Sequence, residues 1–242
     1  WMLFHILYLL LAASVAGLWW LYPLPSLIFF LVISALHFGS SDIRHISPPS
    51  SKDAWVPLIA HGGLVVIAIP VLQSSSVEPL FAALVGTESS LWLVKQINQL
   101  RLPWAACLFA YVIYSVYQPR WRKSLLSLSV LIALAYLLPP LVSFALYFCL
   151  GHSRSHMQRI WRNIAQADRR RSANETLIYS LLAYAAAGVY FVLQTDTASA
   201  SVTAITPALL QLTFIGLAAL TVPHMVLVDF IHGQQQEDQQ HD

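Results

Sequence analysis

Apolar runs long enough to cross a membrane recur along this chain from one end to the other. Of its 242 residues, 57% are hydrophobic and only 10% are charged, whereas a soluble domain carries about 25% charged residues. A helix needs about 20 mainly apolar residues to cross the hydrocarbon core of a bilayer. The sequence therefore predicts an all-α protein, a polytopic transmembrane helical bundle in contact with the lipid bilayer.

The breaks in the apolar pattern predict about eight membrane helices. Their expected ranges are 2–21, 25–39, 54–72, 103–118, 124–138, 140–158, 176–193 and 206–231. The segment 74–100 is too polar and broken to span, and we expect one or two short interfacial helices there. Residues 1–232 are expected to form a single transmembrane domain, and the polar tail 233–242 to be disordered.

Lysine and arginine alternate between the loops in the way expected of a multi-pass protein. The loops at 40–53, 119–123 and 159–175 hold two, three and five Lys or Arg residues, whereas those at 22–24, 139–140 and 194–205 hold none. By the positive-inside rule, the even-numbered helices end in the cytoplasm. This predicts a multi-pass protein of the cell (inner) membrane, and the net charge of +2 argues against a nucleic-acid partner.

Histidines gather in the cytoplasmic half of the predicted bundle. His152 and His156 stand four residues apart, so on an α-helix they share one face with Cβ atoms about 5–6 Å apart. Ionisable residues at membrane depth are costly and are functional candidates by default. On this topology six histidines from four helices lie on that side: His37, His61, His152, His156, His224 and His232. The alternative for the pair is two interfacial histidines solvated by headgroups.

Histidine ligation without cysteine suits Fe(II), Cu or Zn. The zinc-protease motif HExxH is absent, and two histidines on one face of one helix cannot approach a haem from opposite sides. A single non-haem iron held by neutral imidazoles fits best. Two alternatives stay open: a non-catalytic haem- or metal-binding membrane protein, and a transporter with a histidine-lined path.

Four stretches, in order along the chain, resemble the Brp/Blh family of bacterial and archaeal membrane β-carotene 15,15′-dioxygenases. They are SALHFGSSD (34–42), HGGLVVIAIPVL (61–72), YFCLGHSRSH (147–156) and LTVPHMVLV (220–228). The resemblance implies a catalytic domain that uses Fe(2+) and O2 to cleave the central double bond of β-carotene into two molecules of all-trans-retinal. It also implies a microbial rhodopsin as the consumer of the retinal.

The same resemblance implies that His37, His152 and His156 bind the iron. The family has a further ligand in an N-terminal PHGxxD element, which this sequence does not contain. His5 lacks the surrounding residues of that element and is not assigned to this role. We therefore expect the fourth ligand to lie upstream of Trp1, and residues 1–242 to carry an incomplete iron site.

Three further residues are candidates for the metal site or for its surroundings. His224 follows Pro223, and is expected to be a ligand, a partner of a ligand or part of the substrate pocket. His61 precedes a glycine pair that would let a neighbouring helix approach closely, and it is equally well interpreted as a packed core histidine. Asp42 is placed to accept the free N–H of a ligand imidazole, or alternatively to pair with Arg44.

An aromatic group precedes the histidine pair on the same predicted helix. Phe144, Tyr147 and Phe148 are candidates to line an apolar tunnel for the substrate. Ordinary helix packing explains them equally well.

Overall fold

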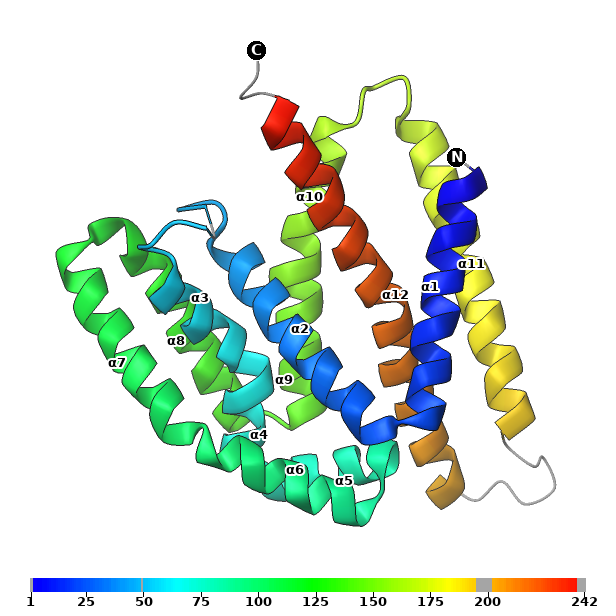
Figure 1. The fold of residues 1–242 in the computed structure, drawn as a ribbon, viewed down its shortest axis with the longest axis horizontal. Helices are drawn as coiled ribbons and strands as arrows, with labels where there is room; N and C mark the ends of the chain where they lie inside the picture. Colours follow the sequence, from blue (N-terminus) through cyan, green and yellow to red (C-terminus); the bar gives the residue numbers. More distant parts are fainter. Residues whose placement is uncertain (1, 49, 195–201, 239–242) are drawn as a thin grey trace. The chain divides into compact units, whose positions relative to one another are not determined.

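The computed structural model describes residues 2–48, 50–194 and 202–238, and every regular element in these ranges is helical (Figure 1). The prediction of an all-α protein is confirmed. Four of the described helices are long and apolar enough to cross a membrane: Pro23–Ile43, Trp55–Leu72, Thr87–Tyr117 and Pro207–Val226. Shorter apolar helices cover His5–Leu21, Ser74–Val85 and Pro140–Ser153. The predicted count of eight spans is therefore not confirmed.

The segment predicted to be interfacial forms two helices, α5 (Ser74–Val85) and α6 (Thr87–Gln99). Gly86 separates them with a φ of 84°, the left-handed region that favours glycine. The expectation of one or two short helices is met, but the second continues almost directly into α7 (Arg101–Tyr117). Because of this continuity, the range Thr87–Tyr117 counts as one long candidate span.

The described chain divides into two compact units. Unit 1 contains α1 (Met2–Leu21), the start of α2 (Pro23–Ile43) and α12 (Val202–Asp238). Helix α1 packs along α12, and the Tyr8 hydroxyl donates a 2.7 Å hydrogen bond to the Leu220 carbonyl. Trp19, Leu27 and other apolar side chains are buried in this unit.

Unit 2 comprises residues 34–82 and 86–188 and holds most of the remaining helices. Its core contains Phe38, Leu58, Tyr111, Trp121 and Leu128, all buried. Besides the end of α2 and the helices α5 to α7, the elements are α3 (Trp55–Gly63), η1 (Leu64–Ala68), α4 (Ile69–Leu72), η2 (Pro119–Trp121), α8 (Arg122–Leu137), α9 (Pro140–Leu146), η3 (Tyr147–Ser153), α10 (Arg154–Asn163) and α11 (Arg169–Gln194). The expectation of one catalytic domain over 1–232 remains a prediction.

Two of the predicted spans are continuous but change their helical winding along the way. The third contains the π-helix η1 and the sixth contains the π-helix η3, in which hydrogen bonds run from i to i+5. His152 lies in η3 and His156 in the following α-helix. The expected uninterrupted α-helical register between these two histidines was therefore wrong.

At the other end, α12 is helical as far as Asp238, whereas residues 239–242 lie outside the described ranges. The predicted disorder of the tail 233–242 stays a prediction.

Helices α2 and α3 approach each other through glycines. A Cβ atom added to Gly39 would collide with the carbonyl oxygen of Leu58, and one added to Gly62 would collide with the carbonyl oxygen of Ala35. Gly63 gives space to the indole of Trp104 in the same way. The expectation that the glycine pair permits close helix approach is confirmed. This contact is what brings the end of α2 against the His61 region of α3.

Candidate functional site

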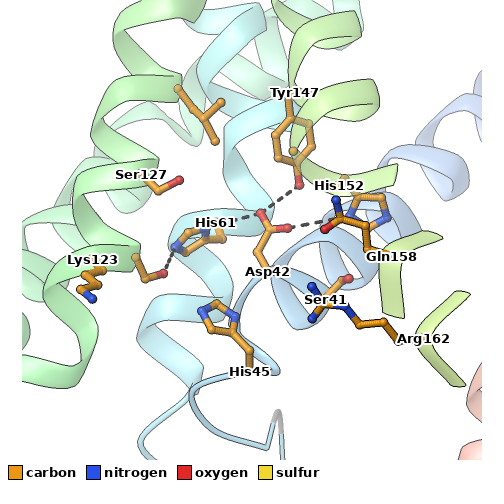
Figure 2. A pocket seen from close by; sticks show the side chains of 13 residues that line it. Ser41, Asp42, His45, His61, Lys123, Ser127, Tyr147, His152, Gln158 and Arg162 are labelled. Atoms are coloured by element: carbon orange, nitrogen blue, oxygen red, sulfur yellow. Dashed lines mark hydrogen bonds and ion pairs between the residues drawn. The ribbon is translucent and has the colours of Figure 1, made fainter. Parts of the chain in front are cut away.

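Asp42, near the C-terminal end of α2, is the meeting point of three side chains (Figure 2). The Tyr147 hydroxyl donates a 3.0 Å hydrogen bond to its Oδ2 atom. His61 places Nδ1 3.5 Å from Oδ2, and His152 places Nδ1 3.8 Å from Oδ1. The described polar neighbours of Asp42 are therefore Tyr147 and two histidines of the candidate set, and Arg44 is not among them.

Both ring nitrogens of His61 face polar side chains. Nδ1 faces Asp42, and Nε2 lies 2.8 Å from the hydroxyl oxygen of Ser124 on α8. The ring is buried, with 4% of the residue exposed, and Tyr111 packs edge-on against it at 5.9 Å between centroids. This geometry favours the interpretation of His61 as a hydrogen-bonded core histidine that supports Asp42.

His37 and His152 lie side by side although they are far apart in the sequence. Their ring centroids are 5.1 Å apart in an edge-to-face arrangement. His37 comes from α2 and is half-buried, whereas His152 comes from η3 and is buried. Two imidazoles this close can contribute donors to one metal ion.

The full predicted ligand set cannot be assembled from the described side chains. Among them, no group of three or more His, Cys, Asp and Glu residues is arranged to hold a metal ion. The side chain of His156 lies outside the described part of the chain, and His224 lies on α12 in unit 1. Iron binding by His37, His152 and His156 therefore stays a prediction, as does a metal role for His224.

The described side chains do provide two adjacent imidazoles, with a carboxylate next to one of them. A histidine ligand commonly turns its second ring nitrogen to a carboxylate, which fixes its tautomer and orientation. His152 has this relation to Asp42, and His37 stands next to it.

A row of aromatic rings adjoins His152 on its apolar side. Phe144 stacks on Phe148 at 5.7 Å, and Phe148 stacks on the His152 ring at 6.1 Å. Phe38 completes the group, 4.9 Å from His152 and 6.3 Å from Phe148 between centroids. Of the three predicted substrate-lining residues, Phe144 and Phe148 belong to this aromatic row.

Tyr147 differs from the neighbouring phenylalanines because it carries a hydroxyl group, which is directed at Asp42. It is 2% exposed, its ring packs on Phe38, and its hydroxyl binds Asp42. The hydroxyl therefore belongs to the polar side of the site.

A polar cavity of about 470 Å³ opens on that side (Figure 2). Asp42, His61, Tyr147 and His152 contribute to its lining. The other lining residues are mainly polar or charged: Ser41, His45, Lys123, Ser124, Ser127, Leu131, Gly151, Gln158 and Arg162. His152 is thus bordered by a polar cavity and by an aromatic row.

The sequence interpretation missed two members of this arrangement, Ser124 and Phe38. Ser124 looked like any serine in an apolar helix, because its link to His61 crosses 63 positions in the sequence. Phe38 offered a weak signal, since it directly follows His37 in the HFGSSD stretch.

Comparisons with known proteins place the chain in a family. The family model described as β-carotene 15,15′-dioxygenase matches residues 1–232. A β-carotene 15,15′-dioxygenase from uncultured marine bacterium 66A03 is 38% identical over 229 residues, which cover 93% of this chain and 79% of the relative. No solved structure matches the chain. By the extent of both matches, the chain belongs to the β-carotene 15,15′-dioxygenase family.

Proposed function

We propose that this protein cleaves the central 15,15′ double bond of β-carotene with O2 and releases two molecules of all-trans-retinal. The observation that carries the proposal is the position of His152, which touches His37, the Asp42 carboxylate and an aromatic row. Family membership supplies the reaction class. The protein would act in the cell (inner) membrane, and a microbial rhodopsin would take up the retinal.

The proposed cofactor is Fe(2+), held by His37, His152 and His156. When bound, the iron would supply the activation of O2, for which imidazole ligands are suited. Asp42 contributes through His152. The separation of 3.8 Å is longer than a hydrogen bond, yet a carboxylate on that side favours the tautomer with its proton on Nδ1 and leaves Nε2 as the metal donor.

The aromatic row and the cavity on either side of His152 indicate where the protein would bind its substrate. β-Carotene is a hydrocarbon dissolved in the bilayer, and Phe38, Phe144 and Phe148 provide an apolar wall beside His152. The cavity on the other side has Asp42, Lys123 and Arg162 in its lining, and a hydrocarbon there would desolvate these charged groups without offering them hydrogen bonds. Positioning of the polyene along the aromatic row would decide which double bond reacts.

The proposal is tested with the protein expressed from its complete gene in β-carotene-producing cells, by chromatography of the carotenoids and retinoids. We expect loss of carotene and accumulation of retinal. Unchanged carotene in membranes that contain the protein would refute the enzymatic function, and apocarotenals from another bond would refute central cleavage. A haem absorption band in the purified protein would favour the non-catalytic haem-binding alternative.

The ligand assignment is tested separately by alanine substitution. His37→Ala, His152→Ala and His156→Ala should each abolish retinal formation and lower the iron bound per protein. His241→Ala removes an imidazole from the polar tail and serves as the control, with unchanged activity expected. A control as damaging as the three ligand variants would refute the assignment.

A further inference from the structure

Tyr147 and His152 both approach the same carboxylate although they are five residues apart. The Tyr147 hydroxyl lies 3.0 Å from Oδ2 of Asp42, and Nδ1 of His152 lies 3.8 Å from Oδ1. The two side chains therefore take one carboxylate oxygen each. Both side chains are buried.

An α-helix would not bring these two residues to one side. At 3.6 residues per turn, positions i and i+5 point roughly 140° apart around the helix axis. In a π-helix the hydrogen bond runs from i to i+5, so those two positions lie one above the other. The π-helix η3 spans Tyr147–Ser153 and includes both residues. The π-helical turn thus aligns Tyr147 and His152 on the face that meets Asp42.

A third side chain lies against the same carboxylate. His61 on α3 contacts Oδ2 through Nδ1, and its other ring nitrogen is fixed by Ser124 on α8. Asp42 therefore has three side-chain neighbours, and the hydrogen bond from Tyr147 is the shortest of these contacts. Removing the Tyr147 hydroxyl would leave one carboxylate oxygen with a weaker set of partners.

We propose that Tyr147 is a positioning residue, whose hydroxyl holds Asp42 in the orientation in which it faces Nδ1 of His152. The proposal rests on the proposed function, in which His152 binds the metal. It replaces the expectation that Tyr147 lines the substrate tunnel, because a phenol facing a hydrocarbon would leave its hydroxyl unsatisfied. In this arrangement Tyr147 touches neither metal nor substrate and acts through Asp42.

The test is Tyr147→Phe, which keeps the ring and removes only the hydroxyl. Co²⁺ serves as the metal probe, and its affinity is measured on the metal-free purified protein by competition with a chelator. We expect the affinity to fall about 10- to 100-fold, as for other losses of a group that supports a metal ligand. The visible spectrum of bound Co²⁺ should change, and kcat should fall while KM for β-carotene stays the same.

Tyr114→Phe is the matched control, since Tyr114 is a half-buried tyrosine of the same unit that packs on Trp121. It should leave metal affinity and kcat unchanged. A raised KM with unchanged metal affinity in Tyr147→Phe would overturn the proposal in favour of a substrate-lining role. Wild-type metal affinity together with wild-type kcat would overturn it outright.

A double-mutant comparison tests the route through Asp42. In an Asp42→Asn background, adding Tyr147→Phe should cause no further loss of metal affinity, whereas additive losses would refute the route. The tautomer of His152, read by nitrogen NMR of the metal-free protein, should shift from Nδ1–H towards a mixture in Tyr147→Phe. An unchanged tautomer would contradict the proposal even if the variant were less stable.

The two proposals fail in different ways. If the wild-type protein forms retinal and binds metal but Tyr147→Phe behaves like it, only the positioning role is lost. If the wild-type protein neither forms retinal nor binds Co²⁺, the proposed function falls, and the positioning role falls with it.

Discussion

Replacing Gly62 with alanine should force α2 and α3 apart. The new Cβ atom would collide with the carbonyl oxygen of Ala35 and lie 3.0 Å from its carbonyl carbon. Both are backbone atoms, which cannot rotate away as a flexible side chain could. The helices must therefore separate, or α3 must shift along α2.

The expected cost follows from two opposing effects. Overpacking of a tight contact costs about 1–3 kcal/mol, and a backbone obstacle places this case in the upper half of that range. The higher helix propensity of alanine returns about 1 kcal/mol. We expect the free energy of unfolding of Gly62→Ala to fall by about 1–2 kcal/mol.

Gly188→Ala is the matched control on α11. An added Cβ atom at Gly188 meets nothing within 4 Å, so only the propensity gain of up to about 1 kcal/mol should remain. The two variants are unfolded in mixed micelles with increasing SDS, and tryptophan fluorescence monitors the unfolding. If Gly62→Ala proved as stable as Gly188→Ala, the tight glycine contact would be refuted. Because His61 is the neighbour of Gly62, the metal affinity of Gly62→Ala should fall as well.

Three further predictions concern other parts of unit 2. Hydrogen bonds from Ser51 and Ser47 and the charge of Arg120 outweigh the effect of burial and hold the pKa of Asp53 below its ordinary value. The contribution of Asp53 to the free energy of unfolding should be complete above the unfolded pKa of about 3.9 and be lost as the pH falls through the lower folded pKa. In unfolding titrations at acidic pH, Asp53→Asn should therefore lose less free energy of unfolding than the wild type. Phe148→Ala should raise KM for β-carotene several-fold in steady-state assays by removing part of the aromatic row, and an unchanged KM would contradict that role. Trp121→Ala should lower the free energy of unfolding by about 3–5 kcal/mol, because the side chain is fully buried, and a loss below about 1 kcal/mol would be inconsistent with that burial.

Much of the candidate site followed from local sequence patterns. HFGSSD places His37 and Asp42 near each other at one helix end, and HSRSH places His152 on a later helix. The structure brings His152 against both residues. Phe148 was singled out in the sequence as a residue that lines the substrate tunnel, which stays a prediction, and its stacking on the ring of His152 is shown only by the structure.

The role of Tyr147 could not be foreseen, because the sequence was interpreted with α-helical spacing. An α-helical pattern groups i with i+3 and i+4, so a pair at i and i+5 looks unrelated. The π-helical winding of Tyr147–Ser153 changes which side chains share a face. The link between Ser124 and His61 was hidden for another reason, since it depends on α8 packing beside α3.

The sequence by itself determined the helical class and the membrane environment of this protein. Both follow from composition and from the length of apolar runs, because a chain in hydrocarbon must satisfy its backbone hydrogen bonds within each helix. Tertiary structure decided which polar groups meet in unit 2. Asp42 contacts His61 because glycines allow α2 and α3 to touch, and it contacts both Tyr147 and His152 because η3 is wound as a π-helix. Those contacts depend on the packing of distant segments and on a local change of helical pitch, and neither is encoded in hydrophobic periodicity.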